Sequence, residues 1–105
     1  MVSINTGMPR ISRHQDLCAT GHLCDDTAPV LSTQSTVFAE GQSMLRFGDP
    51  VAPHKIKRVL CVPHPNQKVK SSSQTVFAEG IGVGRYGDRA DDGFMIGAAF
   101  TVHAG

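Results

Sequence analysis

Apolar and polar residues alternate over short stretches of this chain. Val37 and Ala39 fall on one face of an extended segment and Phe38 on the other, which is the period of two that is typical of a β-strand. Gly41 ends the alternation, and a glycine at such a point favours a hairpin turn. The pattern predicts two hairpins and no helix longer than a single turn. Their strands are expected over residues 36–40, 43–47, 75–79 and 82–86.

The two predicted hairpins belong to an internal repeat. The hexapeptide Thr-Val-Phe-Ala-Glu-Gly occupies residues 36–41 and recurs unchanged at residues 75–80. At the same offset, Arg-Phe-Gly-Asp at 46–49 is followed by Arg-Tyr-Gly-Asp at 85–88. Partial copies stand at both ends, with Arg-His-Gln-Asp at 13–16 and Thr-Val-His-Ala at 101–104. Three units that each need their neighbours are therefore predicted to close around one axis.

Chain length and glycine content fit a single small β-domain. The 105 residues include 11 Gly, 6 Pro and no Trp, so turns are frequent and large aromatic clusters are excluded. We expect one domain over residues 1–105, with a core so small that a cross-link would help to stabilise it. The Arg and Asp of each Arg-x-Gly-Asp element are interpreted as structural turn residues, because an Asp side chain accepts hydrogen bonds from backbone N–H groups in turns.

Charge and cysteine content narrow the functional classes. The formal net charge is +1 with acids and bases interspersed, which argues against a nucleic-acid partner. Residues 1–10 lack the apolar segment of a signal peptide, and the number of cysteines is odd, so synthesis in the cytoplasm without a signal peptide is predicted. With five histidines present, cysteine is favoured here as a metal ligand rather than as a disulfide partner.

Potential metal ligands lie in the three loops between the repeated elements. The first loop contains Cys18, His22 and Cys24, the second contains His54, Cys61 and His64, and the third contains Asp92. Imidazole, thiolate and carboxylate groups can complete a tetrahedral zinc site, and a closed shell of four protein ligands is typical of a structural metal. Because threefold closure would bring the three loops to one vertex, the sequence predicts one bound metal ion there.

The combined pattern resembles the PAAR-repeat proteins over about residues 7–105. The resemblance is carried by the Arg-x-Gly-Asp elements, the Thr-Val-Phe-x-x-Gly strands, the Cys and His of the loops, and the run Asp-Leu-Cys-Ala-Thr-Gly-His at 16–22. The chain departs from the family where Ser-Met-Leu at 43–45 and Gly-Val-Gly at 82–84 replace Pro-Ala-Ala, and where Gln15 replaces a glycine.

The resemblance implies an all-β, small pseudo-threefold conical or pyramidal fold of short hairpins, with metal-pinned loops at its apex. The base of such a fold sits on the trimeric β-helical spike of a phage tail, type VI secretion system or related contractile injection machine. The function implied is mechanical, namely to sharpen the spike, with transient contact with the target membrane and the capacity to carry effector cargo.

The resemblance also implies one structural zinc or iron ion near the apex, bound by three histidines and one cysteine. Transferred to this chain, the histidines are His22, His54 and His64. The family cysteine falls on Asp92, so we expect Cys18 to supply the fourth ligand, because thiolate binds zinc and iron more strongly than a lone carboxylate. Asp92, Cys61 and Cys24 remain alternatives.

Two other functions compete with a spike tip. A small zinc metalloenzyme would need a positioned general base, and neither His-Glu-x-x-His nor Gly-x-Ser-x-Gly occurs in the chain. An effector adaptor has little room for a toxin domain, because the repeats take up the chain. We therefore expect no catalysis. The apolar residues from which a partner-binding base and part of the core would be built are Val37, Phe38, Met44, Val76, Phe77 and Val83.

Overall fold

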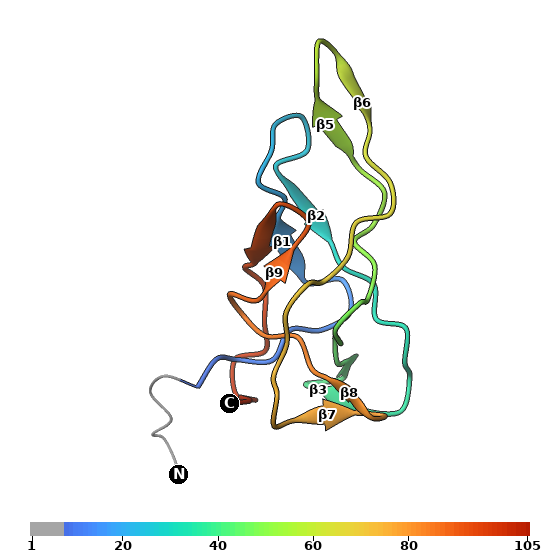
Figure 1. Ribbon diagram of the computed structural model, residues 1–105. Coiled ribbons are helices and arrows are strands. Elements are labelled where there is room, and N and C mark those ends of the chain that lie inside the picture. The colour runs from blue at the N-terminus through green and yellow to red at the C-terminus, as the bar shows by residue number, and fades with distance from the viewer. Residues whose placement is uncertain (1–7) are drawn as a thin grey trace.

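A computed structural model describes residues 8–105, and within that range every regular element is a β-strand. The all-β prediction is therefore confirmed for this part of the chain. No helix that could cross a membrane was found among these residues. The ten strands are short (Figure 1): β1 Leu17–Ala19, β2 Thr27–Pro29, β3 Phe38–Ala39, β4 Gln42–Ser43, β5 Lys55–Lys57, β6 Cys61–Pro63, β7 Phe77–Ala78, β8 Ile81–Gly82, β9 Arg89–Ala90 and β10 Gly93–Met95.

The strands form one four-stranded sheet and three separate hairpins. The sheet has the order β2-β1-β10-β9 with antiparallel neighbours, and the hairpins are β3–β4, β5–β6 and β7–β8. In Figure 1 the β5–β6 hairpin extends at one end of the molecule, whereas β3, β7 and β8 lie at the opposite end. The four-stranded sheet occupies the region between them, so it separates the β5–β6 hairpin from the two repeat hairpins.

The repeated hexapeptide forms the same hairpin in both copies. Glu40 and Gly41 have φ values of 51° and 81°, and the corresponding Glu79 and Gly80 have 51° and 80°. Positive φ at both central residues is the mark of a type I′ turn, whose twist matches that of paired strands. The predicted hairpins are confirmed, but their regular strands are only two residues long.

The strands end early because the chain then pairs with another repeat. Met44 forms an isolated bridge with Arg13, and Val83 forms one with Arg46. Residues that local alternation assigned to the second strand of each hairpin therefore hydrogen-bond across units. Alternation along one segment predicts an extended backbone but cannot identify the partner that it pairs with.

Each Arg-x-x-Asp element forms a turn held by its aspartate. The Arg backbone N–H donates to the Asp Oδ2 at 2.7 Å in the first copy and at 2.8 Å in the other two, which are the pairs Arg13–Asp16, Arg46–Asp49 and Arg85–Asp88. Gln15, which replaces a glycine, still adopts the positive φ of 70° that the turn requires. The structural interpretation of these elements is confirmed.

The residues just before these three arginines form a closed ring of backbone hydrogen bonds. Ser12 N–H donates to Gly84 O at 2.9 Å, Gly84 N–H to Leu45 O at 2.8 Å, and Leu45 N–H to Ser12 O at 3.0 Å. Each unit thus donates to one neighbour and accepts from the other. Ser12 and Leu45 are 33 residues apart and Leu45 and Gly84 are 39 residues apart (45 − 12 and 84 − 45). The ring therefore ties together segments that are distant in sequence.

The core consists of two clusters of small and medium side chains. One cluster includes Cys18, Val30, Leu45 and Met95, and the other includes three alanines that occupy the same position in the three Thr-Val-x-Ala copies, Ala39, Ala78 and Ala104. All three alanines are buried. The partial copy at residues 101–104 therefore packs as the two full copies do, although it lacks their phenylalanine.

A disulfide joins Cys24, in the loop between β1 and β2, to Cys61 at the start of β6. The expectation that cysteine serves here as a metal ligand rather than as a disulfide partner is therefore wrong for this pair. Cys24 also bridges Ile56 of β5, so the two sulfur atoms face each other across adjacent backbone segments. Distances through space of this kind cannot be deduced from cysteine spacing alone.

Candidate metal centre

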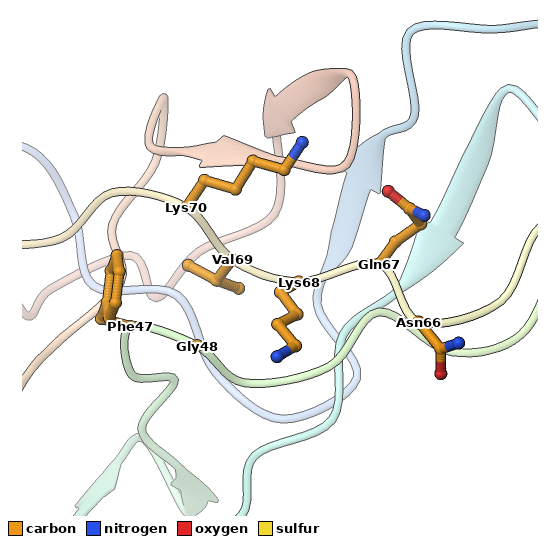
Figure 2. Close-up of a pocket in the computed structure, with 7 residues that line it drawn as sticks. All are labelled: Phe47, Gly48, Asn66, Gln67, Lys68, Val69 and Lys70. Carbon is orange, nitrogen blue, oxygen red and sulfur yellow. The ribbon is translucent and has the colours of Figure 1, made fainter.

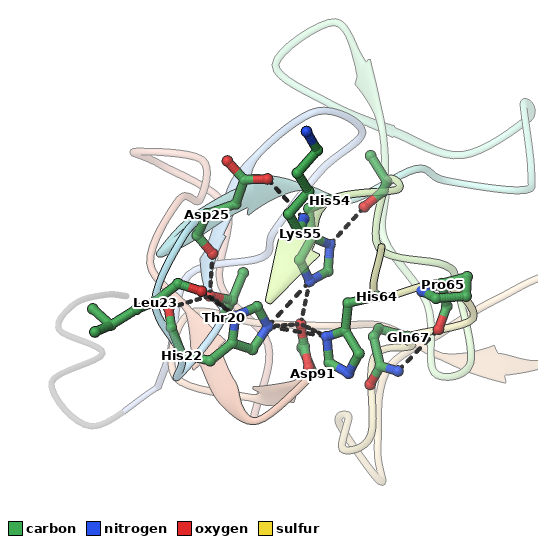
Figure 3. A network of polar contacts seen from close by, with 11 residues as sticks. Thr20, His22, Leu23, Asp25, His54, Lys55, His64, Pro65, Gln67 and Asp91 are labelled. Atoms are coloured by element: carbon green, nitrogen blue, oxygen red, sulfur yellow. Dashed lines mark hydrogen bonds and ion pairs between the residues drawn. The ribbon is translucent and has the colours of Figure 1, made fainter. Parts of the chain in front are cut away.

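Four side chains from three loops converge beneath the β5–β6 hairpin. His22 comes from the loop after β1, His54 directly precedes β5, His64 directly follows β6, and Asp91 lies in the turn between β9 and β10. One ligand atom from each lies within 4.8 Å of all the others. Figure 3 shows ring nitrogens of the three histidines turned towards the Asp91 carboxylate. This group could hold a metal ion.

The distances between these atoms suit a small cation. Asp91 Oδ2 lies 2.6 Å from His54 Nε2, 3.0 Å from His22 Nε2 and 3.6 Å from His64 Nδ1. His22 Nε2 lies 3.2 Å from His54 Nε2 and 3.1 Å from His64 Nδ1. Ligands at about 2.0–2.1 Å from a tetrahedral zinc ion are roughly 3.3 Å apart. Small adjustments would therefore place all four around one ion.

Backbone carbonyls orient two of the imidazoles. His54 Nδ1 lies 2.8 Å from Ala52 O and His22 Nδ1 lies 3.3 Å from Leu23 O. If each Nδ1 carries the proton that it donates, each Nε2 presents a lone pair to the centre of the group, as metal-bound histidines commonly do. Two lone pairs and a carboxylate that face one another form an environment that favours a cation.

Asp91 is the least solvated of the four. Its side chain is fully buried, and its Oδ1 atom has no hydrogen-bond partner among the described residues. A buried carboxylate needs a counter-charge or hydrogen bonds to offset its lost hydration. An ion bound by the histidines would supply that charge, and the unpartnered oxygen is thus an independent sign that the residues present fit a metal.

Close backbone contacts hold the first and third loops together. Gly21 has a φ of 83°, and a Cβ atom there would lie 2.4 Å from Asp92 O. A Cβ atom on Gly93 would lie 1.9 Å from Ala19 O. The hydrogen bond from Asp92 N–H to Thr20 O, at 3.0 Å, completes this contact. Glycines therefore permit the approach that brings His22 next to Asp91.

The second loop brings its two histidines together through strand pairing. Lys55 pairs with Pro63 in the β5–β6 ladder, and His64 N–H donates to His54 O at 2.8 Å just beyond it. Two ligands thus stand at the foot of one hairpin. The structure brings together all three histidines that the sequence singled out.

The fourth member of the group differs from the prediction. Cys18 lies on β1, fully buried in the apolar core between Met95 and Ala28, and does not belong to the group. Burial, together with the nearby negative charge of Asp91, raises the pKa of the Cys18 thiol to about 11. A protonated thiol is a poor metal ligand. Cys24 and Cys61 are also unsuitable, because both sulfur atoms are used in the disulfide.

Asp91, not Asp92, supplies the carboxylate. Asp92 is exposed, whereas the backbone of Asp91 is held by a 3.1 Å hydrogen bond from its N–H to Lys68 O. The sequence contains two adjacent aspartates, and the family position counted from Asp88 pointed to the second, Asp92. A carboxylate ligand from this turn was one of the predicted alternatives, but the structure supplies it from Asp91, one residue earlier. Only the register of the β9–β10 hairpin distinguishes the two.

A separate depression of about 380 Å³ lies between the turn at residues 46–49 and the end of the second loop, and is lined by Phe47, Gly48 and residues 66–70. Figure 2 shows its two lysines, Lys68 and Lys70, pointing in different directions. They do not converge on a common ligand. The depression therefore offers no second site comparable to the histidine group.

No protein-family model matches the chain, and no curated protein matches it significantly. The chemistry of the site is therefore inferred from its ligand atoms and the distances between them. Imidazole and carboxylate ligands suit zinc and divalent iron alike, so the donor set does not fix the identity of the ion. Four protein ligands in one buried group are typical of a structural metal.

Proposed function

We propose that this chain is a PAAR-type tip that caps the trimeric β-helical spike of a contractile injection machine, and that it carries one structural zinc or iron ion and catalyses no reaction. The observation that carries this proposal is the ring of backbone hydrogen bonds among Ser12, Leu45 and Gly84. A ring in which each of three units donates to the next is what a monomer needs to match a partner with true threefold symmetry.

Further contacts also join the three Thr-Val-x-Ala copies in a cycle and support a pseudo-threefold cone. The Glu40 carboxylate accepts hydrogen bonds from Thr101 N–H and Oγ1 at 2.9 and 2.8 Å, and the Glu79 carboxylate accepts one from Thr36 Oγ1. Thr75 Oγ1 donates to Gly105 O at 3.1 Å. The last residue of each Thr-Val-x-Ala-x copy thus receives the threonine of another copy.

The end of the molecule opposite β5–β6 offers the apolar surface for docking. Phe38 and Phe77 are 52% and 55% exposed although both are large and apolar, and they occupy the same position in the two full copies. Val37, Met44 and Val76 are half-buried against the core, and Val83 is completely buried. Of the six residues expected to face a partner, Val83 cannot do so, and the two phenylalanines are the strongest candidates.

The metal would give this small fold the resistance that a tip under load requires. His22, His54 together with His64, and Asp91 belong to three different loops, so one ion would cross-link all three. Structural zinc contributes roughly 10 kcal/mol or more of apparent binding energy in small zinc-binding peptides. A shell completed by protein ligands has no position for a reacting water, which is why we propose a structural role and not hydrolysis.

Binding to the trimeric spike protein tests this function. We expect one chain to bind one spike trimer, and the double substitution Phe38→Asp with Phe77→Asp to abolish that binding. Val59→Asp with Leu60→Asp is the matched control, because these side chains are 90% and 72% exposed at the far end of the molecule. Equal loss of binding in both variants, or a stoichiometry of three chains per trimer, would contradict the proposal.

A further inference from the structure

The disulfide and the candidate metal centre link the same two loops. Cys24 lies two residues after His22, and Cys61 lies on the hairpin that His54 and His64 flank. A metal ion would join the first loop to the second through His22 and the hairpin histidines. The disulfide already joins them a few residues away. Both cysteines are exposed, so thiol reagents in solution can reach the bond.

Two cross-links that close the same stretch of chain reinforce each other. Closing a loop lowers the conformational entropy of the chain. The first cross-link to form removes most of that entropy, so the second cross-link forms at a smaller entropic cost. With the disulfide in place, the ion has less chain left to order. The coupling is reciprocal by thermodynamic necessity, so a bound ion must also make the disulfide harder to reduce.

Apart from the disulfide, three hydrogen bonds hold the first loop against the hairpin. Lys57 N–H donates to Leu23 O at 3.0 Å. Asp25 N–H donates to Lys55 O at 3.2 Å, and Lys55 N–H donates to Asp25 Oδ2 at 2.7 Å. These bonds lie at the exposed edge of β5. Cys24 itself has a φ of 80°, a conformation that is unfavourable for a residue with a side chain. Cleavage of the disulfide would therefore free this segment to relax and His22 to move with it.

We propose that the Cys24–Cys61 pair is a redox control on the metal centre, so that the oxidised chain holds its ion and the reduced chain releases it more readily. The inference rests on the metal centre proposed above and not on the spike-tip function. A dithiol would drive the change by transferring two electrons and two protons to the S–S bond. The products are the Cys24 and Cys61 thiols and the cyclic disulfide of the reagent.

Zinc affinity in the two redox states tests the proposal. The metal-free full chain would be titrated with Zn²⁺ against a chromogenic chelator, once oxidised and once after reduction by a phosphine that is then removed under nitrogen. We expect reduction to weaken zinc binding by about tenfold or more. By reciprocity, a tenfold coupling lowers the reduction potential of the disulfide by about 30 mV when zinc is bound.

Two variants separate a lost cross-link from gained thiols. The double substitution Cys24→Ser with Cys61→Ser removes the cross-link without creating free thiols. We expect this variant to bind zinc as weakly as the reduced chain. Cys18→Ala removes the thiol that forms no disulfide and should leave the oxidised-to-reduced ratio unchanged. If the reduced chain bound zinc more tightly than the oxidised chain, the thiolates would be acting as ligands and the proposal would be overturned.

The remaining outcomes distinguish the two proposals. Equal zinc affinities for the oxidised chain, the reduced chain and the double serine variant would overturn the redox control and leave the metal centre intact. Absence of zinc binding in every form would overturn the metal centre, and the redox control with it. A disulfide reduction potential that zinc does not change would also contradict the coupling.

Discussion

Asp91 is the residue on which the metal centre depends most directly. Substitution by Asn keeps its size but removes its charge, and we expect Asp91→Asn to weaken zinc binding by more than about 100-fold, since loss of a mere outer partner of a ligand already costs 10–100-fold. Asp92→Asn is the matched control, because that side chain is adjacent and exposed. Chelator competition measures both. Similar affinities for the two variants would show that Asp91 is not a ligand.

Cys18 gives a prediction about pH. Because burial raises the pKa of this thiol from 9.0 to about 11, the unfolded chain loses the proton at a lower pH than the folded chain does. The contribution of the protonated Cys18 thiol to the free energy of unfolding is complete below pH 9 and is lost as the pH rises towards 11. We therefore expect the unfolding free energy to fall more steeply over this range in the parent chain than in Cys18→Ala, as measured by denaturant titration. Parallel curves would exclude this contribution.

For single residues, the sequence identifies candidate ligands better than it identifies the residues that they contact. Imidazoles in loops between repeats are few and chemically distinctive, so His22, His54 and His64 could be singled out. The choice between Asp91 and Asp92 depends on where a two-residue turn falls in a ladder, and Cys18 depends on which face of β1 meets the core. Both are properties of strand register, which loop sequences leave open.

The contact between the first and third loops is an element-scale feature that can be tested with glycines. Gly21→Ala introduces a Cβ atom against Asp92 O as well as an unfavourable positive φ, whereas Gly48→Ala has a φ of 84° but open space around its Cβ position. We expect Gly48→Ala to cost about 1–2 kcal/mol of unfolding free energy and Gly21→Ala clearly more, with loss of zinc binding. Equal costs would mean that close approach does not matter here.

Hairpins β3–β4 and β7–β8 could be predicted because a glycine that ends an alternating segment favours a hairpin turn. The four-stranded sheet could not, since β1 pairs with β10 across most of the chain. Nor could the β5–β6 hairpin, because apolar and polar side chains alternate only over residues 55–57 and not over residues 58–63. Local patterns thus predicted the repeated elements, while the segments that carry the metal ligands were recognisable only as loops.

For the whole molecule, removal of the metal should lower the melting temperature sharply. At an ion concentration 1,000 times the dissociation constant, binding stabilises a folded chain by about 4 kcal/mol, and 1 kcal/mol shifts the melting temperature of a small domain by about 4–8 °C. We expect a chelator to lower it by about 15 °C or more in a thermal melt. The same chelator should leave the melting temperature of Asp91→Asn nearly unchanged, and a similar fall in that variant would point to another site.

The repeat fixed the expectation of three units, and the hydrogen-bond ring and the equivalent alanines agree with it, but the outline of the molecule did not follow from the repeat. His54 and His64 lie at the foot of the β5–β6 hairpin, and Figure 1 shows that this hairpin projects at one end of the molecule. The ligands therefore lie beneath a projecting hairpin and not at the outermost point. The hairpins in the other two loops, β1–β2 and β9–β10, lie within the four-stranded sheet, whereas β5–β6 forms a separate hairpin. A repeat pattern contains no information about this difference.

Elemental analysis of the protein purified without added metal is the most direct test of the metal centre. We expect one equivalent of zinc or iron per chain, and none in His22→Ala, because loss of one imidazole opens the shell that joins the three loops. A native protein that is free of metal yet fully folded would contradict it.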